Sequence, residues 1–285
     1  MTADEIAAGL PRSAVEDVVR TALQEDLGFA GDVTTLATVP AEALAAADLV
    51  ARQGGVLAGL PVAGYVFETV GQGRVLVEYG SADGAQVSAG EVLATLRGPV
   101  RDILTAERTA LNLIGHLSGV ATVTRRWVDA VDGTGARIRD TRKTMPGLRA
   151  LEKYAVRCGG GVNHRMSLSD AALVKDNHVV AAGGVVAAFE LVRAAYPGLP
   201  LEIEVDDLAQ AREVIDAGAD LVLLDNMSPD DMREVVRYSA GRAKLEASGG
   251  LRLGNAREVA DTGVDFLAVG ALTHSAAVLD IGLDM

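Results

Sequence analysis

Several residue types are scarce in this sequence, and each scarcity excludes a class of protein. Cys158 is the single cysteine among 285 residues, so no disulfide can form within the chain, which fits a reducing compartment. Aromatic residues make up 4% of the chain. With a pI near 4.7, this scarcity argues against a nucleic-acid-binding protein.

Long apolar segments and a basic N-terminus are also lacking. No apolar run approaches the roughly 20 residues that a membrane-spanning helix needs. Asp4 and Glu5 stand where a secretory signal peptide would carry lysines. The sequence therefore predicts a cytoplasmic protein with no membrane partner.

What remains is the composition of a folded α/β protein. Hydrophobic residues make up 49% of the chain and charged residues 23%. A chain of this length can form two domains, or one large domain with an appendage. The small aliphatic side chains favour helices packed closely on a parallel sheet.

One segment concentrates positive charge in an otherwise acidic protein. Residues 137–175 carry nine Lys or Arg against three acidic residues, a surplus of six positive charges. The formal net charge of the whole chain is −13, so the rest of the chain carries about −19. Threonine, proline, glycine, asparagine and histidine residues interrupt these cations, as in loops rather than on a solvated helix face. We expect the segment to bind a small, highly charged anion.

The first third of the chain predicts an α+β unit. Helical spacing covers residues 13–26, where Ser13 and Glu16 match a capping box, and Asp32 is expected to cap a later segment. A second helix is expected from Pro61 to Val70. Short strand-like segments lie at 45–52, 74–79, 86–87 and 92–96. This third shows no nucleophile, metal-ligand cluster or phosphate loop.

Beyond Ala136 the pattern changes to alternating strands and helices. The strand-like segments end at Asp140, Lys175, Val205, Asp225, Ala247 and Val269. The helical patterns cover 147–158, 184–195, 207–217, 229–239 and 255–262. Six strands that alternate with helices predict a parallel sheet, either open or closed into a barrel.

Polar residues gather where these strands end. They are Arg139–Thr144, Lys175–His178, Glu202 with Glu204, Asp225 with Asn226, Glu246 with Ser248–Gly250, and Gly270 with Ala271. In an α/β barrel the loops at the C-terminal ends of the strands converge on the active site. We therefore expect the active site at this end of the strands.

The last two strand ends suit a phosphate group. Ser248, Gly249 and Gly250 precede a predicted helix, and so do Gly270 and Ala271. Backbone N–H groups at helix N-termini bind dianions, and barrel enzymes often bind phosphate after their final two strands.

Two carboxylates end strands that are otherwise apolar. Facing a phosphate site, Glu204 and Asp225 would hold sugar hydroxyls or a Mg²⁺ ion carried by a diphosphate, because Mg²⁺ prefers oxygen ligands. The alternative is a structural ion pair with Arg142 or Lys143. The two roles are compatible.

His164 and Arg165 follow a run of three glycines and are the best candidates among the remaining polar groups. The histidines do not have zinc-site spacing, and one cysteine cannot build a soft-metal site. Arg108 stands on an otherwise small and apolar helix. It is either a functional cation or a surface partner of Glu107.

These segments resemble the quinolinate phosphoribosyltransferase family along nearly the whole chain. The resemblance is carried by Asp140–Thr144, Pro146–Arg149, Gly159–Gly161, Asn163–Arg165, Lys175–His178, Glu202–Val205, Leu224–Met227, Glu246–Gly250 and Val269–Ser275, with Glu25–Gly28 and Gly31–Thr35 nearer the N-terminus. Met145 departs from the family pattern, which usually has threonine there.

The resemblance implies a two-domain subunit. Residues 1–112 would form an N-terminal α/β sandwich, joined by the tail 273–285, and residues 113–272 an incomplete α/β barrel with its active site at the C-terminal ends of the strands. It also implies a homodimer, with a higher oligomer left open, in which Arg108 reaches the partner's site. The implied reaction joins quinolinate to phosphoribosyl pyrophosphate with Mg²⁺, giving nicotinate mononucleotide, pyrophosphate and CO₂ in NAD biosynthesis.

The resemblance also assigns roles to individual residues. Arg108, Arg142, His164 and Arg165 would bind quinolinate, and Arg forks suit carboxylates. Lys143 and Lys175 would stabilise the departing pyrophosphate, with Lys175 also near a quinolinate carboxylate. Glu204 and Asp225 would hold the ribose hydroxyls and the metal. The remaining substrate-binding positions are Thr141, Ser248, Gly249, Gly250, Val269, Gly270 and Ala271.

Two other functions stay open from the sequence alone. One is a related phosphoribosyltransferase that acts on a different acid, and the arginine set suited to two carboxylates speaks against it. The other is a non-catalytic phosphosugar-binding protein on the same barrel.

Overall fold

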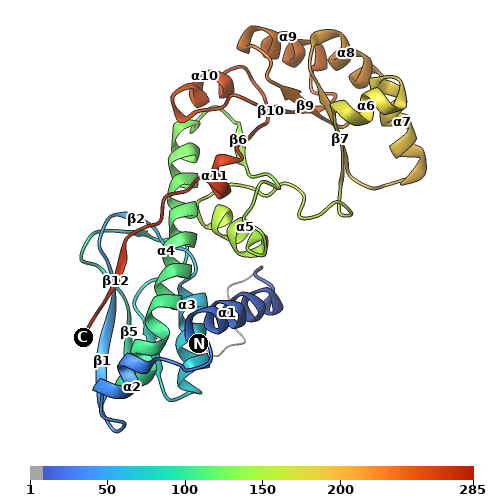
Figure 1. Ribbon diagram of the computed structural model, residues 1–285. Coiled ribbons are helices and arrows are strands. Elements are labelled where there is room, and N and C mark those ends of the chain that lie inside the picture. The colour runs from blue at the N-terminus through green and yellow to red at the C-terminus, as the bar shows by residue number, and fades with distance from the viewer. Residues whose placement is uncertain (1–8) are drawn as a thin grey trace. The chain divides into compact units, whose positions relative to one another are not determined.

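The computed structural model describes residues 9–285 (Figure 1). Asp4 and Glu5, which carry the argument against a signal peptide, lie outside this range. The described chain forms two compact units. The first contains the residues up to Arg125, together with Thr144–Gly160 and Leu272–Met285, and the second contains Arg126–Lys143 and Gly161–Ala271.

The first unit is built around a four-stranded antiparallel sheet. Its strand order is β12-β1-β5-β3, and a separate two-stranded sheet pairs β2 with β4. The strands are β1 (Leu44–Ala51), β2 (Gly55–Val56), β3 (Leu76–Tyr79), β4 (Gln86–Val87), β5 (Val92–Pro99) and β12 (Ile281–Asp284). Its helices include α1 (Arg12–Leu27), α2 (Val33–Thr38), α3 (Leu60–Gly71) and α5 (Arg149–Cys158).

Helix ends in this unit follow from local hydrogen bonding. The Asp32 carboxylate caps α2 as predicted, because its Oδ1 accepts the Thr35 N–H at 2.9 Å. The predicted capping box at Ser13 and Glu16 is wrong. Pro11 is the N-cap residue of α1 and makes no side-chain cap, while Glu16 accepts a bond from Arg12 Nε at 2.7 Å.

The long helix α4 (Val100–Ala130) continues from the first unit into the second. The expected domain boundary at residues 112 and 113 falls inside this helix, and the two compact units meet later in it, between Arg125 and Arg126. Residues 144–160, expected in the barrel, belong to the first unit.

The C-terminal tail joins the first unit as strand β12. It pairs antiparallel with β1, and Leu283 lies opposite Leu49. Arg52 and Asp284 form an ion pair beside this pairing. Upstream, the tail crosses α4 at Gly119, where a Cβ atom would lie 2.1 Å from the Ala277 carbonyl oxygen. A glycine is therefore needed at this crossing.

The second unit contains the six-stranded parallel sheet that the alternation predicts. The strand order is β6-β11-β10-β9-β8-β7. The strands are β6 (Arg137–Arg139), β7 (Ala172–Val174), β8 (Leu201–Val205), β9 (Leu221–Asp225), β10 (Lys244–Ser248) and β11 (Phe266–Ala268). Since β6 and β7 are edge strands, the sheet is open, and Val162 makes an isolated parallel bridge with Arg139 beside β6.

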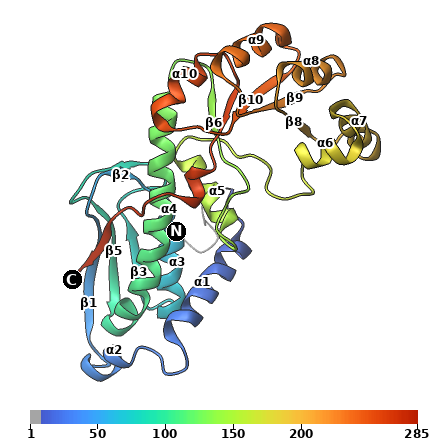
Figure 2. The same ribbon diagram turned by 45° about the horizontal axis from the view of Figure 1, so that its top comes forward.

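Helices cover the outer face of this sheet, and α8 and α9 lie together beside β8 and β9 (Figure 2). These helices are α6 (Asp176–Ala182), α7 (Val185–Ala195), α8 (Leu208–Asp216), α9 (Pro229–Ser239) and α10 (Ala256–Ala260). The short helix α11 (Ala271–His274) begins the return of the chain to the first unit, which resumes at Leu272. Asp207 caps α8 and Ser228 caps α9 through their side chains. The sequence pattern did not predict α6.

Within residues 9–285, no single helix has the length and apolar character needed to cross a membrane. Only α6 and α7 taken together, bent by 89°, reach that length and composition.

The pairing of β12 with β1 generates a stability prediction. Removing residues 281–285 should lower the free energy of unfolding by about 2 kcal/mol or more, because Ile281 is buried and full burial of such a side chain contributes roughly 1.5–3 kcal/mol. Calorimetry would measure the change in Tm. Removal of the exposed Met285 alone is the control. Equal Tm values for the two truncations would contradict a stabilising role for β12.

Candidate active site

The alternation of side chains along the parallel strands places one set of residues on the face opposite the helices. Leu223 and Asp225 share a face of β9 because they are two residues apart, and Glu246 and Ser248 share a face of β10 for the same reason. All four line one cavity, together with residues from the neighbouring strands. The cavity therefore lies on the inner face of the open barrel, at the C-terminal ends of its strands.

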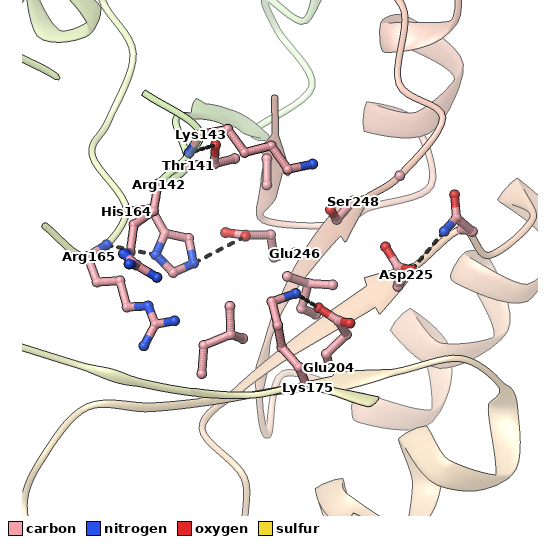
Figure 3. Close-up of a pocket in the computed structure, with 15 residues that line it drawn as sticks. Thr141, Arg142, Lys143, His164, Arg165, Lys175, Glu204, Asp225, Glu246 and Ser248 are labelled. Carbon is pink, nitrogen blue, oxygen red and sulfur yellow. Dashed lines mark hydrogen bonds and ion pairs between the residues drawn. The ribbon is translucent and has the colours of Figure 1, made fainter. Parts of the chain in front are cut away.

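The cavity has a volume of about 540 Å³, which suits a small-molecule ligand (Figure 3). All of its lining residues belong to the second unit. They are Thr141, Arg142, Lys143, His164, Arg165, Leu173, Lys175, Glu204, Leu223, Asp225, Asn226, Glu246, Ser248, Gly249 and Ala268.

Asp140 connects the two cationic loops of the cavity. Its carboxylate is fully buried and accepts the His164 N–H at 2.7 Å and the Asn163 side-chain amide at 2.5 Å. The next residues carry Arg142 and Lys143 into the cavity wall. One buried carboxylate thus holds the loop after β6 against the loop that bears Arg165.

Two arginines meet in this wall. The Arg165 guanidinium donates to the Ala171 carbonyl at 2.9 Å. Burial lowers the pKa of Arg165, and the neighbouring charge of Arg142 lowers it further. The Nε atoms of both arginines are buried and, among the described residues, find no hydrogen-bond acceptor. Two neighbouring, partly buried guanidinium groups with spare donors favour an anionic ligand.

His164 lies between the cationic wall and two buried glutamates. Its Nδ1 accepts the Arg165 backbone N–H at 2.7 Å, so the ring proton must be on Nε2. That nitrogen lies 2.7 Å from Glu202 Oε2 and 3.7 Å from Glu246 Oε1. Arg139 Nη1 donates to Glu246 at 2.7 Å. Both ring nitrogens of His164 are thus engaged within the protein.

The same three side chains form a geometric candidate for a metal site. The ligand atoms of His164, Glu202 and Glu246 lie within 4.8 Å of one another. However, a metal on Nε2 would need the lone pair of that nitrogen, which carries the proton when Nδ1 accepts a hydrogen bond. The cluster therefore suits shared protons better than a metal ion.

Burial raises the pKa of Glu202 to about 7, against the opposing charges of Arg139 and Arg165. Burial also raises the pKa of Glu246 to about 7, and the charge of Glu202 adds to the effect. Two neighbouring carboxylates with few partners cannot both ionise readily, so near neutral pH the pair holds a proton.

Two further carboxylates face the cavity from the centre of the sheet. Lys175 donates to Glu204, which is 9% exposed, and Asn226 Nδ2 donates to Asp225 Oδ2 at 2.7 Å. The partners of these two carboxylates are thus Lys175 and Asn226, rather than the Arg142 or Lys143 considered from the sequence. As hard oxygen donors in one cavity, Glu204 and Asp225 fit a Mg²⁺ ion that takes its other ligands from a diphosphate and water.

The glycine loop after β10 has the backbone that the phosphate hypothesis requires. Gly249 and Gly250 have φ of +81° and +60°, which disfavour any residue with a side chain. The predicted helix does not follow directly, because a 3₁₀ turn (Leu253–Asn255) comes first and α10 has five residues. After Gly270, α11 has four residues. Phosphate binding here would thus depend on loop N–H groups rather than on helix dipoles.

The structure brings most of the predicted site residues into one cavity. Ten of them line it: Thr141, Arg142, Lys143, His164, Arg165, Lys175, Glu204, Asp225, Ser248 and Gly249. Gly250 continues the same loop, Val269–Gly270 follow β11, and Ala271 begins α11. Arg108 is exposed on α4 in the first unit, and its role stays a prediction.

Glu202, Glu246 and Asn226 are among the polar residues expected at the strand ends, but the sequence predicts no individual role for them. A signal existed for the glutamates, since a charged residue inside a buried strand must find a partner. The role of Asn226 depends on a neighbouring strand and had no comparable signal.

An open parallel sheet with a cationic cavity and two central carboxylates defines an α/β enzyme for a multiply charged anionic substrate. Family models agree with this class. The model described as quinolinate phosphoribosyl transferase, C-terminal domain, matches residues 120–284, and the N-terminal domain model matches residues 32–118. The chain belongs to the quinolinate phosphoribosyltransferase family.

Individual relatives cover nearly the whole chain. The nicotinate-nucleotide pyrophosphorylase (carboxylating) of Mycobacterium leprae is 54% identical over 95% of this chain and 97% of its own length. The probable enzyme of that name from Bacillus subtilis is 41% identical over 92% and 90%. Among solved structures, NadC from Streptococcus pyogenes has a TM-score of 0.94 at 38% identity, covering 98% of each chain.

The buried glutamate pair generates a pH prediction. Folding raises both pKa values from 4.5 to about 7, so the stability that each protonated glutamate contributes is fully present below pH 4.5 and should be lost as the pH rises through 7, by up to about 3 kcal/mol for each glutamate. Glu202→Gln and Glu246→Gln should each make stability less dependent on pH between 5 and 8. Denaturant unfolding at several pH values would measure this. The exposed Glu258→Gln is the control, and an unchanged slope in both buried variants would contradict the prediction.

Proposed function

We propose that this protein transfers the phosphoribosyl group of phosphoribosyl pyrophosphate to quinolinate and decarboxylates the product. The quinolinate nitrogen forms a bond to C1 of the ribose as the bond from C1 to the pyrophosphate oxygen breaks. The cationic ring then accepts the electrons of the departing CO₂, and a proton takes its place. The observation that carries the proposal is the cavity itself, where Arg142, Arg165 and two lysines line the same walls as the carboxylates of Glu204 and Asp225.

The two arginines of the cavity wall supply the quinolinate subsite. Their unpartnered Nε groups suit the two carboxylates of the substrate. Lys175 lies across the cavity and adds a third cation, and Arg108 of a partner subunit adds a fourth. His164 forms the wall of this subsite, where its Nδ1 accepts the Arg165 N–H and its Nε2 lies 2.7 Å from Glu202 Oε2.

The sugar diphosphate lies along the central strand ends. Lys143 and Lys175 stabilise the leaving pyrophosphate, Glu204 and Asp225 bind the ribose hydroxyls, and the loops at Ser248–Gly250 and Val269–Ala271 bind the 5′-phosphate. Glu204 and Asp225 would hold a Mg²⁺ ion, which would supply electrostatic stabilisation of the leaving group. Fixed charges and positioning then provide most of the rate enhancement.

The working form of the enzyme is a homodimer in the cytoplasm. Arg108 is an exposed cation on a helix whose neighbouring side chains are small and apolar, which suits a residue that acts on a second subunit. The single cysteine and the reducing environment that it implies agree with a cytoplasmic location.

The reaction is tested by following nicotinate mononucleotide and CO₂ together, with quinolinate, phosphoribosyl pyrophosphate and Mg²⁺ supplied. We expect equal amounts of both products from quinolinate and none from nicotinate run in parallel, because nicotinate lacks the second carboxylate. Omission of Mg²⁺ should lower the rate. Turnover of nicotinate alone would overturn the two-carboxylate subsite, and binding of the sugar diphosphate with no turnover of either acid would indicate a binding protein.

The shared site is tested by mixing two inactive variants. Arg108→Ala and Lys175→Ala should each be nearly inactive, and a mixture that has exchanged subunits should recover about a quarter of the wild-type rate, because half of the dimers carry one intact site. Steady-state assays after verified subunit exchange would measure the recovery. A mixture that stays inactive would place Arg108 outside the partner's site.

A further inference from the structure

We infer that Asn226 is a positioning residue that holds the Asp225 carboxylate and the Ser248–Gly250 loop in one fixed arrangement. Three separate contacts of Asn226 carry the inference, and none involves a residue outside the second unit. The consequence for ligand binding rests on the proposed function, since it assumes that these two elements bind the same sugar.

The first contact is with Asp225. Asn226 Nδ2 donates to Asp225 Oδ2 at 2.7 Å, which is the dashed line at Asp225 in Figure 3. A carboxylate only accepts hydrogen bonds, so the amide must present its nitrogen to Asp225 and its oxygen to the opposite side. This bond restricts rotation of the carboxylate and leaves the second oxygen, Oδ1, for a ligand.

The second contact is with the backbone of the next strand. The Asn226 N–H donates to the Ser248 carbonyl at 2.9 Å, which continues the pairing of β9 with β10 beyond Asp225 and Ser248. Asn226 has φ of +53°, in the left-handed region. Asparagine tolerates this conformation better than most residues. The turn brings its side chain back beside the residue that precedes it.

The third contact explains Gly249. A Cβ atom at this position would lie 2.2 Å from Asn226 Oδ1 and 2.5 Å from its Cγ. Only glycine therefore allows the loop backbone to pack directly on the amide. Asn226 Oδ1 faces the phosphate loop, while Nδ2 of the same amide donates to Asp225. The two ends of one amide group therefore contact two parts of the cavity.

This arrangement matches a property of the proposed substrate. The ribose hydroxyls and the 5′-phosphate of phosphoribosyl pyrophosphate belong to one small sugar whose bonds limit the distance between them, so the groups that bind them must stay within that distance of each other. Asn226 is the residue that connects these groups through its backbone and its amide. Loss of Asn226 should weaken binding of the sugar diphosphate. Binding of quinolinate at the Arg142 and Arg165 subsite should be unaffected.

The experiment compares Asn226→Ala, Asn226→Asp and Asn226→Gly with the wild type. Each protein is assayed for kcat and for the KM of each substrate, and direct binding of phosphoribosyl pyrophosphate is measured by calorimetry with Mg²⁺. We expect kcat/KM for phosphoribosyl pyrophosphate to fall about 10- to 100-fold, as for other residues that orient a ligand-binding carboxylate. The KM for quinolinate should change less than about threefold. Among the three variants, Asn226→Asp should bind phosphoribosyl pyrophosphate most weakly, because it places a like charge beside Asp225.

Two further variants separate positioning from folding. Asn226→Gly relieves the left-handed backbone, so its Tm should be retained while binding falls. Ala240→Gly relieves the same kind of backbone strain at the end of α9 (φ +46°), and it should leave activity unchanged. Gly249→Ala should weaken binding, and adding Asn226→Gly should recover part of the loss, because the atoms that clash with the new Cβ are then absent.

The outcomes distinguish this inference from the proposed function. Asn226→Asp that binds better than Asn226→Ala would show that the amide only fills space, and would overturn the inference. Equal losses for both substrates together with a lowered Tm would also overturn it, in favour of a general structural role. A wild type that binds the sugar diphosphate without turnover, with weaker binding in the Asn226 variants, would support the positioning role while overturning the proposed reaction.

Discussion

The cationic cavity depends on buried carboxylates beneath it. Arg142 lies close enough to Arg165 to lower the pKa of Arg165, so a cavity with these two cations needs compensating negative charge nearby. The charges of Asp170 and Glu202 oppose this effect on Arg165. Asp140 accepts the backbone and amide donors that hold both cationic loops, and Glu246 accepts from Arg139 in the layer below. The cavity can therefore remain positive at its surface because negative charge is buried under it.

The strand order distributes charge around the opening of the barrel. The edge strands β6 and β7 would be neighbours in a closed barrel, and Lys143 and Lys175 follow these two edges. The carboxylates of Glu204 and Asp225 lie on β8 and β9, nearer the centre. Cations therefore lie on both sides of the opening between β6 and β7, and acids lie along the middle of the sheet. This order suits an anionic group that binds at the opening and a sugar that binds across the centre of the sheet.

Local sequence signals predicted the strands and most helices of this fold, but not the contacts between them. The six strand ends follow from apolar runs that stop at polar residues, and Asp32 caps its helix through a bond three residues away. The helix α6 was missed because it is short and has no buried face from which a period could be read. The capping box at Ser13 failed because Glu16 has a competing partner, Arg12, one turn away. The partner of Glu204 depends on β7 lying beside β8, which no local pattern encodes.

A glycine is easier to recognise in this sequence than the residue whose packing requires it. Gly249 is visible in the sequence as a position without a side chain, and its assignment to phosphate binding rests on that, on the helix predicted to follow and on its place after one of the last two strands. Glycine is required at this position for two independent reasons, its positive φ and its close packing against Asn226. The packing against Asn226 is the contact that links the loop after β10 to the Asp225 carboxylate at the end of β9. A loop that binds phosphate through its backbone needs a neighbouring residue to fix its position, because glycines contribute no side chains that could do so. In this sheet, the amide of Asn226 packs against the loop and supplies that contact.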